Sequence, residues 1–76
     1  MNWEQRIVID PAIMGGKPVI KGTRVPVQVI VGSLAGGDTI PDVCTSYRVT
    51  EDDVRAALAY AAEVLSQERL HALPGG

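Results

Sequence analysis

Apolar residues in the first part of the chain form two short runs with the character of strands. Residues 5–10, Gln-Arg-Ile-Val-Ile-Asp, predict the first strand, and residues 18–21 predict the second. Asp10 and Pro11 end the first strand, because the residue before a proline is held extended and aspartate favours turns. The two strands are expected to pair as a hairpin or across a dimer interface.

From residue 26 onward the apolar positions follow a helical period. Residues 26–35 contain several valines with strand propensity, which makes this segment ambiguous. The spacing i, i+3, i+4 and i+7 nevertheless describes one face of a helix and is met by Val27, Ile30, Val31 and Leu34. Pro26 suits a helix start and Gly36-Gly37 a helix end. We therefore predict a helix over 26–35.

Two further helices follow, each opened by a threonine. Thr39 is expected to cap a helix that ends near Ser46 or Tyr47, with its apolar face at Ile40, Val43, Cys44 and Tyr47. Thr50 is expected to cap a third helix that runs to about Arg69. One face of this helix is predicted to consist of Val54, Ala57, Leu58, Ala61 and Leu65.

The 76 residues allow one small domain. We predict a mainly α fold over residues 1–70, with a β element over 5–25, a helical part over 26–70 and a frayed tail over 71–76. A core built from Val, Ile, Leu and Ala in so short a chain is thin. We therefore expect a homodimer or a larger assembly.

Cysteine usage and hydropathy favour a cytoplasmic protein. Cys44 is the single cysteine, so no disulfide can form within the chain, as is usual in a reducing compartment. The first residues are charged and do not resemble a signal peptide. No apolar run is long enough to span a membrane, so no membrane contact is expected.

Charge is distributed unevenly along the chain. Residues 11–37 carry Lys17, Lys21 and Arg24 and no acid, whereas the remaining residues hold all nine acids and have a net charge of −5. The segment 15–26 combines these cations with glycines and prolines, which predicts a rigid turn-strand-turn platform. Such a platform is suited to a polyanion, although the same pattern is met by an ordinary solvated hairpin.

The two helices predicted at 39–47 and from 50 onward have the spacing of a helix-turn-helix. The second of them begins with Glu51-Asp52-Asp53, which phosphates would repel, and Arg55 can pair with Glu51 at i, i+4. Many three-helix cores with such short turns bind no DNA. If this chain does bind DNA, the contacts are expected from the hairpin, with the helical motif serving mainly as scaffold. The predicted DNA-binding residues are Lys17, Lys21, Arg24, Arg48 and Arg55.

No combination of residues in the chain indicates catalysis. Gly15-Gly16-Lys17 lacks the leading glycine of a phosphate loop, and Pro18 stands where such a loop needs Ser or Thr. Cys44 lies on an apolar face without a histidine beside it, and His71 has no second metal ligand. We expect a protein that is not an enzyme, with no cofactor and no metal.

Two stretches of the sequence resemble the domain of unknown function 433 family, over roughly residues 6–65. The first stretch is Ile9-Asp10-Pro11 followed by Gly15-Gly16-Lys17-Pro18-Val19-Ile20-Lys21-Gly22-Thr23-Arg24-Val25-Pro26-Val27. The second comprises Leu34-Ala35-Gly36-Gly37, Thr39-Ile40, Tyr47 and Thr50-Glu51-Asp52-Asp53-Val54-Arg55-Ala56-Ala57-Leu58-Ala59-Tyr60-Ala61. In this family the residue after Tyr47 is usually proline, whereas this chain has Arg48.

This resemblance implies a homeodomain-like helix-turn-helix fold with a short N-terminal β-hairpin. It also implies the antitoxin of a type II toxin–antitoxin pair, which binds a PIN-like ribonuclease toxin and represses its own operator DNA. The alternative is a protein-interaction or dimerisation module that does not touch DNA, which the net charge of −2 favours. Arg24 contacts DNA in the first interpretation, but it could instead pair internally with a carboxylate such as Asp10.

Overall fold

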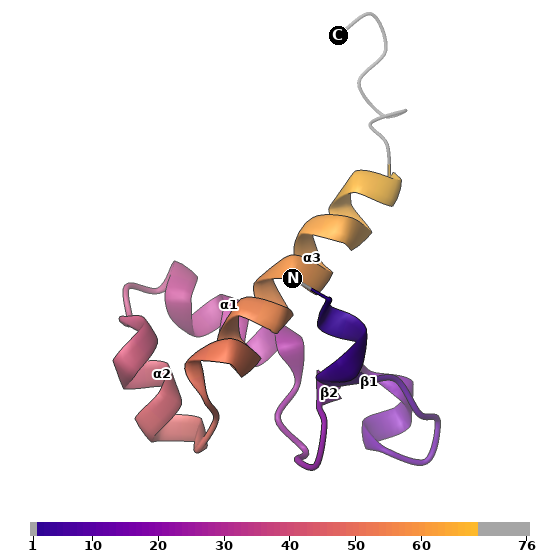
Figure 1. The fold of residues 1–76 in the computed structure, drawn as a ribbon, viewed down its shortest axis with the longest axis horizontal. Coiled ribbons are helices and arrows are strands. Elements are labelled where there is room, and N and C mark those ends of the chain that lie inside the picture. The colour runs from indigo at the N-terminus through magenta and orange to yellow at the C-terminus, as the bar shows by residue number, and fades with distance from the viewer. Residues whose placement is uncertain (1, 69–76) are drawn as a thin grey trace, which may run out of the picture.

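A computed structural model describes residues 2–68 of the chain (Figure 1). The elements follow in the order η1 (Trp3–Gln5), β1 (Ile7–Val8), η2 (Met14–Gly16), β2 (Val19–Ile20), α1 (Val27–Ala35), α2 (Ile40–Tyr47) and α3 (Glu51–Glu68). The predicted mainly α fold, three helices with an N-terminal hairpin, is confirmed. The frayed tail predicted for 71–76, together with Arg69 and His71, lies outside the described residues.

The two strands pair with each other, antiparallel, within one chain. Ile7 lies opposite Ile20, and Val8 lies opposite Val19. Both strands are shorter than predicted. The first begins late because Gln5 belongs to the 3-10 turn η1, which the Asn2 side chain caps and the Arg6 N–H closes on the Trp3 carbonyl at 2.9 Å.

Strand β2 is held on its other side by the chain that leads into α1. The Ile20 N–H donates to the Val25 carbonyl at 3.0 Å, and the Val27 N–H donates to the Pro18 carbonyl at 2.9 Å. Between these bonds the chain makes a β-turn, closed by the Thr23 N–H on the Ile20 carbonyl at 3.0 Å. Gly22 has φ +79° in this turn, a conformation that favours glycine. The turn is thus a fixed projection rather than a loose loop.

The helices begin where the threonines predict. The Thr39 hydroxyl accepts from the Asp42 N–H, and the Asp42 carboxylate accepts from the Thr39 N–H, which is a complete capping box. Thr50 and Asp53 make the same reciprocal pair at the start of α3, at 3.1 and 2.9 Å. Only residues 48–50 separate α2 from α3. Pro26 precedes α1 as its N-cap instead of lying within its first turn.

The core is aliphatic and receives residues from the hairpin and from all three helices. It consists of Ile7, Ile20, Val27, Ile30, Val43, Val49, Val54, Ala56 and Ala57. Ala56 was not predicted on the inner face of α3. Leu58 and Leu65, which were predicted there, are 39% and 64% exposed.

The exposure of Leu65 follows from the lengths of the helices. α3 has 18 residues and α1 has 9, which corresponds to about 27 Å against about 14 Å. The outer half of α3 therefore extends beyond the body of the molecule, as Figure 1 shows. On one side this outer half of α3 is covered by η1. The ring of Trp3 packs edge-on against the ring of Tyr60, with 4.8 Å between the ring centroids, and Trp3 Nε1 donates to the Glu63 carboxylate at 3.1 Å.

Candidate functional site

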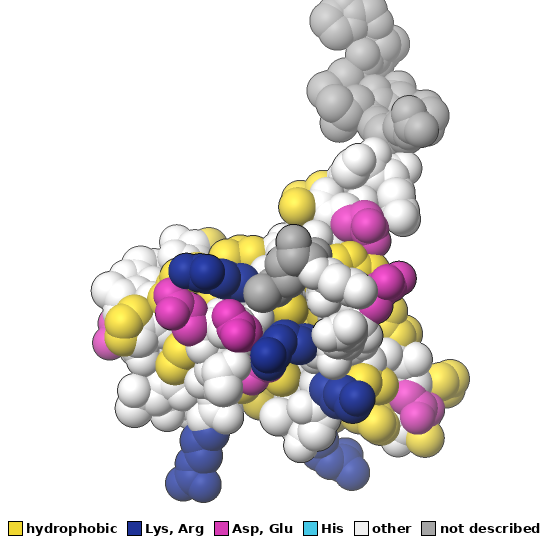
Figure 2. Space-filling view, in the orientation of Figure 1, with side chains coloured by type: hydrophobic (Ala, Val, Ile, Leu, Met, Phe, Trp, Pro, Cys, Tyr) yellow, Lys and Arg dark blue, Asp and Glu magenta, His cyan; other side chains and the backbone are white. Residues whose placement is uncertain are grey.

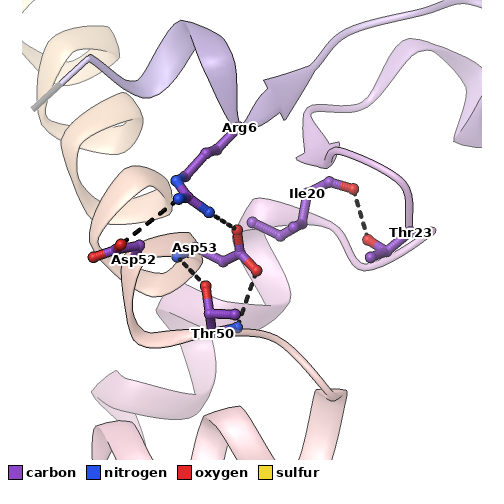
Figure 3. Close-up of polar contacts among 6 residues, drawn as sticks. All are labelled: Arg6, Ile20, Thr23, Thr50, Asp52 and Asp53. Atoms are coloured by element: carbon purple, nitrogen blue, oxygen red, sulfur yellow. Dashed lines mark hydrogen bonds and ion pairs between the residues drawn. The ribbon is translucent and has the colours of Figure 1, made fainter.

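The acidic first turn of α3 is bound to the hairpin by an arginine (Figure 3). Arg6 follows η1 and directly precedes β1. Its Nη1 donates to Asp53 Oδ1 at 3.0 Å, and its Nη2 lies 3.6 Å from Asp52 Oδ2. Arg6 therefore offsets part of the negative charge that would repel phosphate at this helix start.

Asp53 is the most strongly held carboxylate of this cluster. Burial raises its pKa, but the hydrogen bond from the Thr50 N–H, the bonds from Arg6 and the Thr50 hydroxyl, and the positive charge of Arg6 act in the opposite direction. Together they hold the pKa of Asp53 below its ordinary value. Asp53 is accordingly an ionised structural group that both caps α3 and anchors β1.

Arg55, one of the predicted DNA-binding residues, has an internal partner. Its Nη2 lies 3.2 Å from Glu51 Oε2, four residues earlier on α3. Both side chains are about 60% exposed, so water screens the pair and it contributes little to stability. The pairing foreseen from the i, i+4 spacing is present, and Arg55 has less free charge to offer a ligand than an unpaired cation.

Lys21 lies within the β-turn that follows β2 and Arg24 directly follows this turn, and both side chains are exposed. No ion pair joins Arg24 to Asp10 within the described chain. One oxygen of the Asp10 carboxylate accepts from the Ala12 N–H at 2.8 Å and forms a local turn. Within the described residues Arg24 makes no ion pair with a carboxylate, so the internal alternative for Arg24 is not realised there.

Arg48 lies in the short connection between α2 and α3, in the left-handed conformation with φ +58°. Its N–H donates to the Cys44 carbonyl and closes α2, and its side chain is exposed. This connection and the turn after β2 lie at the same lower edge of the molecule in Figure 1. Figure 2 shows Lys and Arg side chains projecting from that edge, while Asp and Glu gather higher on the body. We refer to the exposed cations of these two turns, Lys21, Arg24 and Arg48, as the cationic edge.

Lys17 is exposed like the other predicted residues but faces a different depression. Lys21 borders a polar depression with Gln5, Arg6 and Asp53, and Arg24 borders one with Ile13, Gly22 and Thr23. Lys17 instead lines an apolar groove between the start of α1 and the outer half of α3. The hairpin therefore presents its three cations in separate surroundings instead of on one flat platform.

The groove beside Lys17 was not predicted from the sequence. It has a volume of about 300 Å³ and is lined by Lys17, Pro18, Pro26, Val27, Gln28, Val31, Tyr60, Ala61, Val64 and Leu65. We call it the α1–α3 groove. Lys17 is its single charged lining residue among residues 2–68, so the groove is suited to an apolar ligand surface.

The described residues, 2–68, contain no group of three or more His, Cys, Asp and Glu side chains that could hold a metal ion. Cys44 packs half-buried against the core. In the same part of the chain, no helix is long and apolar enough to cross a membrane.

Comparison with known proteins agrees with the motifs of the hairpin and the helices. The family described as "Protein of unknown function (DUF433)" matches residues 7–61. The chain belongs to this family. The matched residues run from the start of β1 to the middle of α3, so they include the cationic edge and end within the α1–α3 groove.

Two relatives match over most of this chain. A protein of Mycobacterium tuberculosis named "Putative antitoxin VapB45" is 38% identical over 55 residues, which are 72% of this chain and 23% of that protein. The uncharacterized protein y4eO of Sinorhizobium fredii is 34% identical over 56 residues, 72% of this chain and 25% of the relative. The chain thus spans about a quarter of the length of these relatives.

One solved structure shares the fold. The crystal structure of Rv2018 from Mycobacterium tuberculosis superposes with a TM-score of 0.63 at 40% sequence identity. The superposition covers 68% of this chain and 24% of that one. About two thirds of this chain therefore recurs as one part of a longer protein.

Proposed function

We propose that this DUF433 chain is an antitoxin that binds a toxin protein and its own operator DNA, and that it acts by binding and not by catalysis. The observation that carries the proposal is the 38% identity to "Putative antitoxin VapB45" over 72% of the chain. The toxin class suggested by the family resemblance is a PIN-like ribonuclease.

The cationic edge supports the DNA-binding part of the proposal. Lys21, Arg24 and Arg48 project from two turns and are exposed, so they can approach phosphates without leaving a buried partner. The start of α3 is less suited to this task because its carboxylates remain in place even when paired with Arg6 and Arg55. DNA would therefore meet the turns of the molecule before the acidic helix start.

Self-association belongs to the same proposal. A dimer presents two cationic edges, which matches the two half-sites of a palindromic operator. The affinity of such a complex falls as salt rises, because phosphate contacts release counterions.

Two experiments test the two halves separately. A mobility-shift assay on the promoter upstream of the gene should show a complex at low salt that Arg24→Ala with Lys21→Ala abolishes, while Arg55→Ala leaves it nearly unchanged. Co-expression with the adjacent gene product should relieve its toxicity and co-purify the two proteins. If the protein shifts no promoter DNA at low salt, even with the toxin present, the repressor part of the proposal is wrong.

A second candidate is an interaction module that does not bind DNA. The specific observation in its favour is the α1–α3 groove, an apolar surface without a covering side chain among the described residues. This candidate predicts that toxin binding persists unchanged in the Lys21→Ala and Arg24→Ala variants and that no promoter complex forms in the parent chain.

A further inference from the structure

We infer that the α1–α3 groove is the site at which a second copy of this chain docks, with Leu65 of each copy seated in the groove of the other. This deepens the self-association part of the proposed function by placing the interface on the outer half of α3. The β-hairpin, already paired within its own chain, is then not the dimer contact.

The first argument is that this region of α3 has apolar surface that the other described residues leave uncovered. Leu58 and Leu65 are 39% and 64% exposed, and they are two turns apart on one side of the helix. Ala61 and Ala62 lie between them, and such small side chains let a second helix approach closely. A seam of this spacing is typical of helix pairing.

The second argument is that the seam and the groove are contiguous. Leu65 forms part of the groove wall and is also the most exposed large apolar side chain in the described part of the chain. In a two-fold arrangement the same patch serves both copies, so a projecting residue next to a groove is self-complementary. Each Leu65 would cover the Val31 and Val64 side of the partner's groove.

The third argument is charge complementarity. In the described part of the chain, Lys17 is the one charged residue that lines the groove. In residues 58–67, the part of the outer half of α3 whose side chains the structure describes, Glu63 is the one charged residue. A second α3 laid into the groove thus brings negative charge to Lys17. DNA would make no apolar contact with the groove, and a basic peptide would bring a charge of the same sign as Lys17.

The occupancy of the groove is tested with the whole 76-residue chain by sedimentation velocity over a wide range of concentration. The parent chain is expected to sediment as a dimer that dissociates on dilution. Leu65→Glu should weaken the dimer by roughly thirtyfold or more, as expected for a central interface residue. Lys17→Glu should weaken it as well. Ile9→Ser is the matched control, because Ile9 is 53% exposed but does not line the groove.

Hydrogen exchange locates the contact independently. Amides of residues 58–67 should become more protected as the parent concentration rises, but not in Leu65→Glu, whose monomer stays helical by circular dichroism because Leu65 lies outside the core. A parent chain that is monomeric throughout overturns the inference, as does a dimer that Leu65→Glu leaves intact. If the parent chain forms the predicted dimer but shifts no DNA, the inferred interface stands and only the repressor part of the proposed function is wrong.

Discussion

Arg6 and Asp53 join the two parts of the molecule, since Arg6 Nη1 donates to Asp53 Oδ1 at 3.0 Å across a sequence separation of 47 residues. Through this bond the end of η1 and the start of β1 are held against the first turn of α3. The bond also leaves the α3 cap carboxylate with two sets of donors, Arg6 and Thr50. The relationship links the position of the hairpin to the helical core.

The first prediction concerns Arg6→Ala. Removing the guanidinium leaves a half-buried carboxylate without its long-range partner, so the free energy of unfolding should fall by about 1 kcal/mol, a value that allows for the partial exposure of Arg6. Urea denaturation measures the change. Arg55→Ala, which breaks the exposed pair with Glu51, should change stability by less than about 0.5 kcal/mol. Equal losses from the two variants would contradict this difference.

The second prediction concerns acid. The pKa of Asp53 is lowered in the folded chain, because the bonds from Thr50 and Arg6 outweigh the effect of burial. The stabilisation of the folded chain by ionised Asp53 is fully present above the ordinary carboxyl pKa of about 4. It is lost as pH falls through the lower pKa that Asp53 has in the folded chain. The pKa of Asp42 is lowered by the Thr39 backbone hydrogen bond and acts in the same direction.

We therefore expect stability to decline with pH below about 4, and Asp53→Asn to make that decline shallower. Urea titrations at a series of pH values give the slope. In an Arg6→Ala background the effect of Asp53→Asn on the slope should be smaller, because part of the pKa difference has already been removed. An unchanged pH slope in Asp53→Asn would show that other carboxylates control the acid transition.

The third prediction separates stability from DNA binding at Arg48. Its left-handed conformation costs a side-chain-bearing residue about 1 kcal/mol more than glycine, so Arg48→Gly should raise the thermal midpoint. The same change removes one cation from the cationic edge and should weaken the promoter complex. Arg48→Pro should destabilise the chain, because proline cannot reach φ +58° and lacks the N–H that bonds the Cys44 carbonyl.

The fourth prediction concerns the salt dependence of the proposed promoter complex. Each cation that neutralises a phosphate contributes about 0.9 to the slope of log affinity against log salt. Lys21→Ala and Arg24→Ala should each reduce the slope by about one, largely without regard to DNA sequence. Arg55→Ala is the matched control and should leave the slope close to that of the parent, since Glu51 already pairs with Arg55. A full unit lost in Arg55→Ala would place DNA against α3 instead.

The fifth prediction tests the contact between α1 and α2. The hydroxyls of Ser33 and Tyr47 lie 2.9 Å apart, partly shielded from water. Tyr47→Phe removes this bond while keeping the ring, so the free energy of unfolding should fall by about 1 kcal/mol. Ser33→Ala should cost a similar amount, and the double variant should cost less than the sum of the two. Strict additivity would mean that the two hydroxyls do not depend on each other.

Features that depend on neighbouring residues could be derived from the sequence. The starts of α2 and α3 follow from Thr39 and Thr50, because a capping threonine and its carboxylate partner are only three residues apart. The pair between Arg55 and Glu51 follows from one turn of helix. The exposed turn around Gly22 follows from the glycine that its left-handed conformation requires.

Features that depend on the path of the chain through space could not. Arg6 and Asp53 are far apart in sequence, and the chain contains several other acids with which an arginine before the first strand could pair. The sequence therefore does not identify Asp53 as the partner of Arg6. The periodicity of α3 predicts that Leu65 lies on the inner face of this helix. It does not predict the length of α1, which is too short to cover Leu65, so Leu65 is exposed. Lys17, Lys21 and Arg24 are close in sequence, yet the bonds of β2 to both of its neighbours direct them to different depressions.

The helices, their caps, the hairpin and the family can thus be derived from the amino-acid sequence, because residue spacings of a few positions record them. Which charges are paired, which apolar side chains stay exposed and where the α1–α3 groove opens become known only from the folded chain. The physical reason is that ion pairs and grooves form between side chains brought together by the packing of distant elements, and that packing is a property of the whole chain.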